Sequence, residues 1–229
     1  MRLKNKTALI TGAARGIGLA FARAYLAEGA EVAIADINLE AAQKAATSLG
    51  PKAHAIALDV TRQDSIDAAF AEAVQKMGKL DILINNAALF SAAPIAEITR
   101  ADYDKLFAVN VAGTLFCLQA AAKHMIPRGE GTIINMASQA GRRGEGLVAV
   151  YCATNANATV SIGTRPSSDV SATCPSPANI ATASAFALPH PCALATSTNG
   201  NQCVGIAAWK NATVNPVAAK VVSTVEFIR

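Results

Sequence analysis

The feature that most constrains the fold is the alternation of short apolar segments with longer helical patterns over the first 150 residues. Consecutive strands that are separated by helices of ten or more residues pair in parallel, through right-handed crossovers. The sequence therefore predicts an α/β fold with a doubly wound parallel sheet, whose ligand crevice lies at the carboxyl ends of the strands. The predicted strands cover residues 7–11, 31–37, 53–58, 80–84 and 131–136, and the predicted helices cover 17–27, 39–49, a segment from Ser65 onward, and 103–125.

The chain changes character near residue 155. Residues 1–155 carry 30 charged side chains, whereas residues 156–229 carry six and hold six of the nine prolines. Prolines at that density do not fit long helices or interior strands. We therefore expect an α/β domain over residues 1–155 and an atypical Pro/Ser/Thr-rich tail over 156–229. In this tail we predict no strand of the kind the first domain has, although residues 217–228 could form a strand or a helix.

Composition excludes several classes of partner. The net charge is only +4 and the strongest basic feature is the pair Arg142 and Arg143, without interleaved aromatic residues, so we expect no nucleic-acid partner. The five cysteines form no CxxC pair, which favours reduced thiols and no metal site. No apolar run approaches 18 residues and no signal peptide follows Met1, so we expect a soluble cytoplasmic protein without a membrane partner.

A glycine-rich turn joins the first predicted strand to the first predicted helix. In this turn Gly12 allows a sharp bend, Gly16 lets the backbone approach a pyrophosphate, and Gly18 permits close packing of the helix on the strand. The amino end of the helix then presents free N–H groups and a partial positive charge to phosphates. The predicted phosphate-binding residues are Gly12, Arg15, Gly16, Ile17 and Gly18.

An acidic residue follows at the distance that a dinucleotide site requires. Asp36 lies 18 residues after Gly18, at the end of the second predicted strand. A carboxylate at this place accepts hydrogen bonds from the two hydroxyls of an adenosine ribose and repels a 2′-phosphate. The sequence therefore favours NAD over NADP as the cofactor, although Arg15 could attract a phosphate.

Further motifs follow in order along the chain. An Asn-Asn-Ala-Ala stretch ends the fourth predicted strand, an Asn-Val-Ala-Gly stretch lies on the long helix, and a tyrosine follows a serine by 13 residues. Together with the glycine turn, these motifs resemble the classical short-chain dehydrogenases/reductases, which have a Rossmann-like fold. Within that family, residues 85–90 and 135–145 look like those of bacterial sorbitol and galactitol dehydrogenases, and the resemblance covers residues 1–154.

The resemblance implies an NAD-dependent oxidoreductase that acts on a small polyol at its second carbon. It implies that Ser138 holds the substrate oxygen, that Tyr151 takes the hydroxyl proton, and that Asn110 anchors a water linking the family's lysine to solvent. It also implies a homodimer or homotetramer. The residues that it assigns to the cofactor beyond the glycine turn are Asp59, Val60, Asn86 and Ala87.

Position 155 departs from the family pattern. The family has a lysine four residues after the tyrosine, where the two side chains are neighbours on one helix face. A phenol has a pKa of about 10, and nearby positive charge is needed to lower it. Here the residue is Asn155, which is neutral and too short to reach a ribose. We therefore predict a protein that binds NAD but turns over slowly or not at all.

Three interpretations of the tail remain open. A frameshift, a chimera or a sequencing error beginning near residue 155 would explain the lost lysine and the change of composition together. A divergent but foldable tail would give a cofactor-binding protein without catalysis. The third interpretation is an appended carbohydrate-binding module, suggested by the single tryptophan, Trp209.

Overall fold

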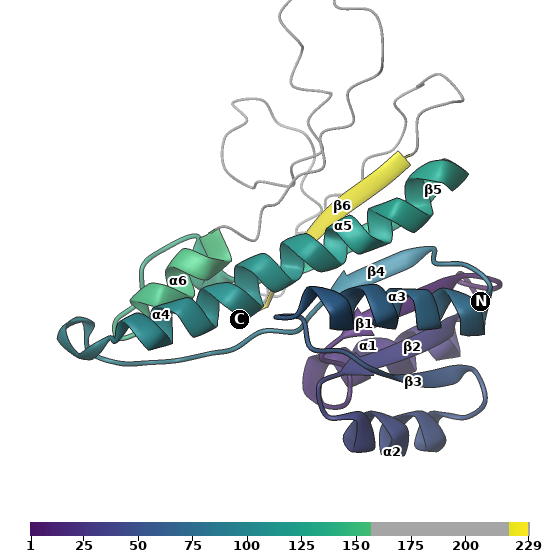
Figure 1. Cartoon of the computed structure of the whole chain (residues 1–229), viewed down its shortest axis with the longest axis horizontal. Coiled ribbons are helices and arrows are strands. Elements are labelled where there is room, and N and C mark those ends of the chain that lie inside the picture. Colours follow the sequence, from purple (N-terminus) through teal and green to yellow (C-terminus); the bar gives the residue numbers. More distant parts are fainter. Residues whose placement is uncertain (157–219, 229) are drawn as a thin grey trace, which may run out of the picture.

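Six parallel strands form one sheet in the computed structural model, which describes residues 1–156 and 220–228. The strand order is β3-β2-β1-β4-β5-β6, so the direction of winding reverses between β1 and β4 (Figure 1). This arrangement confirms the predicted doubly wound fold and puts the crevice at the carboxyl ends of these two strands. The strands are β1 (Thr7–Thr11), β2 (Glu31–Asp36), β3 (Ala53–Ala57), β4 (Ile82–Asn85), β5 (Glu130–Ser138) and β6 (Lys220–Ile228).

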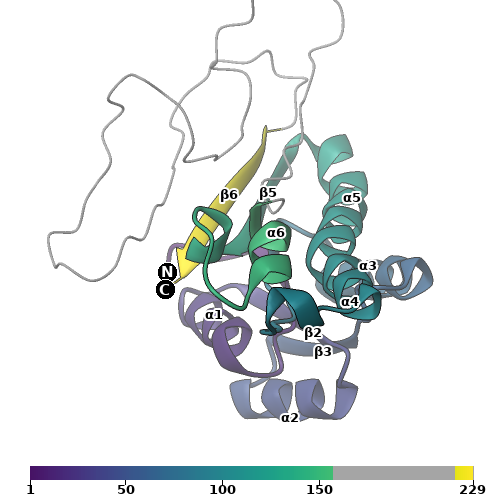
Figure 2. The same ribbon diagram turned by 90° about the vertical axis from the view of Figure 1, so that its left-hand side faces the viewer.

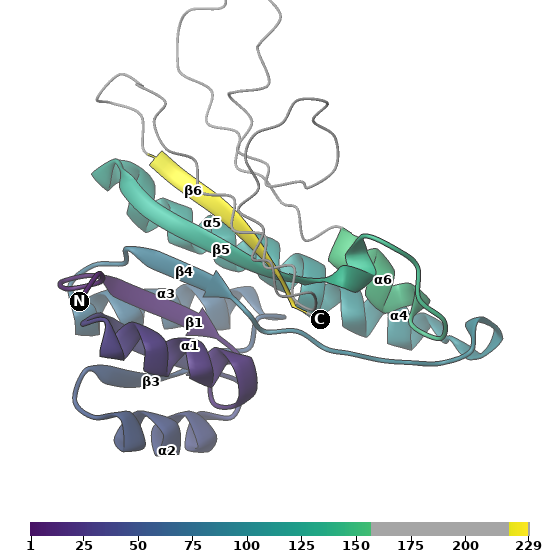
Figure 3. The same ribbon diagram turned by 180° about the vertical axis from the view of Figure 1, so that it is seen from behind.

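Helices cover both faces of this sheet. The view in Figure 2 places α1 and α5 on opposite sides of the strands, and Figure 3 shows α1 in front of the sheet with α5 behind it. The helices are α1 (Gly16–Ala27), α2 (Leu39–Leu49), α3 (Gln63–Met77), α4 (Arg100–Phe107), α5 (Thr114–Met125) and α6 (Ala149–Ala156). Short 3₁₀ turns occupy η1 (Ile95–Glu97), η3 (Ile126–Arg128) and η4 (Gln139–Gly141), and η2 (Ala108–Gly113) is a π-helix.

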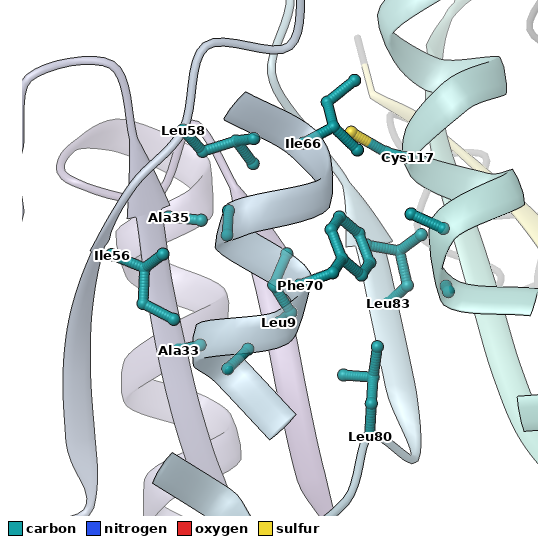
Figure 4. Close-up of a cluster of buried hydrophobic side chains, with 14 of the residues drawn as sticks. Leu9, Ala33, Ala35, Ile56, Leu58, Ile66, Phe70, Leu80, Leu83 and Cys117 are labelled. Carbon is teal, nitrogen blue, oxygen red and sulfur yellow. The ribbon is translucent and has the colours of Figure 1, made fainter. Parts of the chain in front are cut away.

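Within residues 1–156, two apolar clusters form the core, one on each face of the sheet. Because successive side chains of a strand point to opposite faces, Leu9 joins one cluster and Ile10 the other. The first cluster lies under α3 and α5, where Phe70 contacts the strands (Figure 4). Cys117 belongs to the same cluster, and its burial raises the pKa of its thiol to about 12.

The long helix predicted over 103–125 is interrupted. Its central segment, η2, is a π-helix, and it separates α4 from α5. The continuous helical run Arg100–Arg128 has 29 residues and a mean hydropathy of 1.4, which meets the length and composition of a membrane span. Core helices meet the same test, and here α5 packs against α3, β4 and β5, so the run does not indicate a membrane protein.

The expectation that residues 156–229 hold no strand of the kind the first domain has is wrong for the segment 217–228, which had been left open as a strand or a helix. Strand β6 pairs in parallel with β5 along its whole length, with Lys220 opposite Glu130 and Ile228 opposite Ser138. The segment that could have been a strand or a helix is therefore a strand. The physical reason is its content of β-branched and aromatic residues, which favour extended backbone.

At the amino ends of the strands, a buried carboxylate joins three segments. Asp81 is 3% exposed and accepts hydrogen bonds from the Thr7 backbone N–H at 3.0 Å and from Arg128 Nη2 at 2.5 Å. Lys79 Nζ lies 2.8 Å from the second carboxylate oxygen of Asp81, Oδ2. Burial alone raises the pKa of Asp81, but the hydrogen bonds from Lys79, Thr7 and Arg128 outweigh burial and hold the pKa below its usual value.

Candidate functional site

The glycine turn after β1 has the backbone that its sequence predicts. Gly12 and Gly16 have φ angles of +63° and +58°, which favour glycine. A Cβ on Gly12 would lie 2.9 Å from Ala87 Cα, and one on Gly18 would lie 2.7 Å from Asn86 Nδ2. The turn is therefore packed directly on the chain that leaves β4, and larger residues do not fit there.

The amino end of α1 is open for an anion. The cap residue, Arg15, makes no side-chain hydrogen bond to the first turn, and both Arg15 and Ile17 are exposed. The first-turn N–H groups of a helix carry partial positive charge. This end of α1 therefore fits a phosphate group, as the glycine pattern predicts.

Asn86 and Ala87 hold the glycine turn in place. The Asn86 Nδ2 group donates to the carbonyl oxygens of Thr11 at 3.0 Å and Gly12 at 3.1 Å. In return, the Thr11 hydroxyl accepts hydrogen bonds from the backbone N–H groups of Asn86 at 3.0 Å and Ala87 at 2.9 Å. These four bonds fasten the end of β4 to the end of β1, so both predicted cofactor residues act here on the shape of the turn.

Asp36 lies at the carboxyl end of β2, beside the same turn. Its Oδ2 accepts a hydrogen bond from the Ala14 N–H at 3.0 Å, and its Oδ1 accepts one from the Asn38 N–H at 3.0 Å. These bonds fix the direction of the carboxylate. Each oxygen keeps a further lone pair, because a carboxylate accepts about four hydrogen bonds. The group can therefore still receive two ribose hydroxyls.

Asp59 and Val60 follow β3 on the same edge of the sheet. The Asp59 Oδ1 accepts hydrogen bonds from the backbone N–H of Thr61 at 2.9 Å and from its hydroxyl at 2.6 Å. Val60 lies against η2, since a Cβ on Gly113 would be 2.8 Å from Val60 Cγ2. Val60 thus packs the end of β3 against η2, while Asp59 fixes the turn that follows β3.

The serine and the tyrosine of the motif lie on adjoining segments. Ser138 ends β5, and its Oγ accepts a hydrogen bond from the Ala140 N–H at 3.2 Å in the turn η4. Tyr151 lies on α6, which packs on η4. The backbones of η4 and α6 approach each other closely, since a Cβ added at Gly141 would lie only 2.7 Å from the Asn155 carbonyl carbon.

The Asn110 side chain, on η2, contacts two neighbouring segments. Its Oδ1 accepts a hydrogen bond from the Leu89 N–H at 2.8 Å, and its Nδ2 donates to the Leu89 carbonyl at 2.9 Å. The same Nδ2 donates to Thr154 Oγ1 at 3.1 Å. Asn110 therefore ties the loop after β4 to α6 directly.

Asn155 is turned back onto its own helix. Its Nδ2 donates to the Tyr151 carbonyl oxygen at 2.9 Å. The side chain therefore reaches the backbone of the tyrosine and brings no charge to the site. This contact is possible because residues four apart lie one above the other on a helix.

The predicted site residues fall into two groups along one edge of the sheet. One group surrounds the ends of β1, β2, β3 and β4, and the other surrounds the end of β5 and α6. Sequence reasoning missed Thr11 and Thr154, whose hydroxyls connect the segments within each group. Thr11 directly precedes the glycine turn, and Thr154 directly precedes Asn155, the position at which the family pattern has a lysine, so adjacency to a motif position was the available signal.

A family model described as "short chain dehydrogenase" matches residues 6–162. The chain is 68% identical over 157 residues to "Sorbitol dehydrogenase" of Cereibacter sphaeroides, a match that covers 68% of this chain and 61% of the relative. It is 54% identical over 157 residues to "Galactitol 2-dehydrogenase" of Agrobacterium fabrum (strain C58), with the same two coverages. The chain thus spans about three fifths of the length of the curated relatives that it matches.

Among solved structures, the fold is similar to the crystal structure of 3-ketoacyl-(acyl-carrier-protein) reductase from Brucella melitensis complexed with NADH. The TM-score is 0.65 at 34% sequence identity, and the match covers 67% of this chain and 65% of the other.

Proposed function

Because this chain belongs to the short-chain dehydrogenase family, we propose that it binds NAD and carries the reaction centre of a polyol dehydrogenase with strongly reduced turnover. Family membership confirms the resemblance of residues 1–154 and makes the chain an oxidoreductase by descent. NAD, the polyol and the low turnover are the proposal.

The nucleotide end fits NAD on three observations. The turn leaves no room for a Cβ at Gly12 or Gly18, the amino end of α1 is uncapped by Arg15, and the Asp36 carboxylate is fixed beside the turn. A carboxylate in that position repels a 2′-phosphate, which favours NAD over NADP. The Brucella relative described above is complexed with NADH, which agrees with a nicotinamide cofactor.

At the reaction end, Ser138 and Tyr151 supply the polar groups. Bound NAD would supply a hydride acceptor for the alcohol carbon, and a base would then have to take the hydroxyl proton. In this proposal Ser138 Oγ holds the substrate oxygen, and the Tyr151 phenol is the group that takes the proton. General-base catalysis of this kind contributes about 10²–10⁴ in rate, and for a phenol it depends on positive charge nearby.

The observation that carries the proposal is the contact of Asn155. Its amide donates to the Tyr151 carbonyl oxygen at 2.9 Å, so position 155 holds the helix backbone and provides no cation for the phenol. The fold of the site is retained while its chemistry loses a charge. The result is a site that binds cofactor and reacts slowly.

The test is NADH formation with sorbitol and galactitol, measured for the unmodified chain and for Asn155→Lys. We expect the substitution to raise turnover by about 10²–10⁴-fold. Gln75→Lys adds the same charge on the exposed surface of α3 and should change nothing. A turnover of about one per second or faster in the unmodified chain contradicts low activity, and calorimetry that detects no NAD binding contradicts the whole proposal.

We also propose that residues 1–155 form the cofactor-binding domain and that 156–229 have a different origin. The family match ends at residue 162, close to the change in composition. Resequencing the coding DNA across codons 150–160 tests for a frameshift or chimera. A reading frame that reproduces the sequence favours a divergent tail instead.

The assembly and location remain part of the proposal. A homodimer or homotetramer would cover Leu115 and Phe116, which are 41% and 39% exposed on α5. Sedimentation of the full chain measures this directly, and a monomer at all concentrations contradicts it. A cytoplasmic location, without nucleic-acid or membrane partners, stays a prediction.

A further inference from the structure

A chain of hydrogen bonds connects the backbone of Tyr151 to the loop after β4. The Thr154 side chain is fully buried, and its hydroxyl donates to the Tyr151 carbonyl oxygen at 2.9 Å. The same hydroxyl accepts a hydrogen bond from Asn110 Nδ2 at 3.1 Å. Through Asn110, this bond continues to both backbone polar groups of Leu89.

The ring of Tyr151 makes a second contact with the same loop. Phe90, the residue after Leu89, contacts it edge to face, with ring centroids 5.0 Å apart and planes at 73°. This geometry is one that aromatic pairs prefer. The loop after β4 therefore reaches Tyr151 twice, through hydrogen bonds to the helix backbone and through the ring of Phe90.

We propose that Thr154 is a positioning residue for Tyr151, an inference that rests on the proposed function of that tyrosine. A hydroxyl is both a donor and an acceptor, so Thr154 connects the amide of Asn110 to the carbonyl of Tyr151, which also accepts a hydrogen bond from the Asn155 amide. Asn110 is fixed in turn, because the backbone of Leu89 occupies its oxygen and one of its N–H groups. The position of α6 is thereby set relative to the end of β4.

Valine has the shape of threonine but cannot make either bond. In Thr154→Val, one N–H of Asn110 is left in a buried place without its partner, and α6 loses its hydrogen-bonded connection to the loop after β4 while the ring contact with Phe90 remains. A displacement of about 1 Å between reacting groups can cost about 100-fold in rate. Thr154→Ser keeps the hydroxyl and should keep the position of Tyr151.

A second threonine provides a matched control. Thr47 on α2 makes a similar local bond, from its hydroxyl to the Gln43 carbonyl at 2.9 Å, but it is exposed and lies on a helix away from Asn110. Thr47→Val therefore removes the same kind of helix contact without touching the connection to Tyr151.

The first measurement needs no catalysis. The full chain is labelled with 3-fluorotyrosine, and Tyr151→Phe assigns its resonance among those of the three tyrosines. We expect Thr154→Val to shift or broaden the Tyr151 fluorine signal, while Thr154→Ser and Thr47→Val leave it in place. An unchanged Tyr151 signal in Thr154→Val overturns the proposal.

The second measurement uses the same variants in the Asn155→Lys chain, with polyol oxidation as the readout. We expect Thr154→Val to lower kcat by about 10- to 100-fold, with KM and NAD affinity nearly unchanged. A loss confined to KM, or an equal loss in Thr154→Ser, overturns a positioning role. If Asn155→Lys is itself inactive, the proposed function fails, and the fluorine spectrum still decides the role of Thr154.

Should Thr154→Val not fold, Thr154→Cys replaces it in both measurements. A thiol is a weak donor of similar volume. We expect Thr154→Cys to give intermediate effects. Its fluorine shift and its loss of kcat should be larger than those of Thr154→Ser, and smaller than those expected when both hydrogen bonds of residue 154 are lost. Values equal to those of threonine contradict the proposal.

Discussion

The two ends of the sheet are held together by different chemistry. At the amino ends of the strands, Asp81 is buried with Arg128 and Lys79 in a charged network. At the carboxyl ends the contacts are neutral amides: Asn110 binds the backbone of Leu89 in the loop after β4, and Asn155 binds the Tyr151 carbonyl on its own helix. Amides place a backbone without the desolvation that buried charges require, but they cannot stabilise a phenolate. The geometry of the reaction end can therefore persist after its charge is lost.

The largest loss of stability is expected when the charged network at the amino ends of the strands is broken. Asp81→Ala removes the carboxylate that Arg128 and Lys79 share, and losing one partner of a buried ion pair costs about 3–5 kcal/mol. Because both cations are partly exposed, we expect about 3 kcal/mol in urea unfolding. Asp67→Ala, which removes an exposed contact with Lys123, should cost less than about 0.5 kcal/mol. Equal losses in the two variants would mean that the network does not stabilise the sheet.

The next largest loss of stability is expected when the amide contacts at the carboxyl ends are removed. Asn110→Ala leaves the N–H and C=O of Leu89 without their side-chain partners, and each unsatisfied buried polar group costs about 1–3 kcal/mol. Leu89 is only half-buried, so we expect about 2 kcal/mol in total by urea unfolding. Asn38→Ala, which removes the exposed cap of α2, is the control and should cost about 1 kcal/mol or less. A loss at Asn110 no greater than at Asn38 would refute the role given to its amide.

The pH dependence of stability separates the two ends further. The folded pKa of Asp81 is lowered, so its contribution is complete above the unfolded value of about 4 and disappears as pH falls through the folded value. Urea midpoints between pH 6 and pH 2 should therefore fall less steeply in Asp81→Asn than in the unmodified chain. Asn110→Ala should keep the original slope, since it removes no ionisable group. A steeper slope in Asp81→Asn would reverse the assignment.

The smallest effect concerns the ring contact at the reaction end. Phe90 is 67% exposed, so Phe90→Leu should change the free energy of unfolding by about 0.5 kcal/mol or less. In the Asn155→Lys chain we expect kcat to fall a few-fold, because the edge-to-face contact orients the Tyr151 ring. Ile95→Leu, at another exposed apolar position, should change neither quantity.

Local pattern was sufficient to predict much of this structure. The alternation of apolar runs and helices predicted β1 to β5 and the helices between them, and the glycine turn with Asp36 marked the crevice. These features depend on neighbours close in sequence. The segment 217–228 was left open between strand and helix because its pairing with β5 is a tertiary contact.

The connections within the site were beyond local reasoning for the same reason. Asn110 meets Leu89 across 21 residues and Thr154 across 44, so no spacing rule pairs them. The π-helix at η2 was likewise predicted as ordinary helix. The role of Asn155 was predicted as a missing charge, whereas its bond to the Tyr151 carbonyl became visible only in the structure.

The π-helix has one last consequence for the long helix that contains it. An additional residue in a helical turn rotates everything that follows by about 100° about the axis. Consequently α4 can pack on α6 while α5, further along the same helical run, packs on the sheet. Deleting Val109 would restore uniform winding and swing one half away from its neighbour, so a single-residue deletion there should be far more damaging than one in the loop at Gly144.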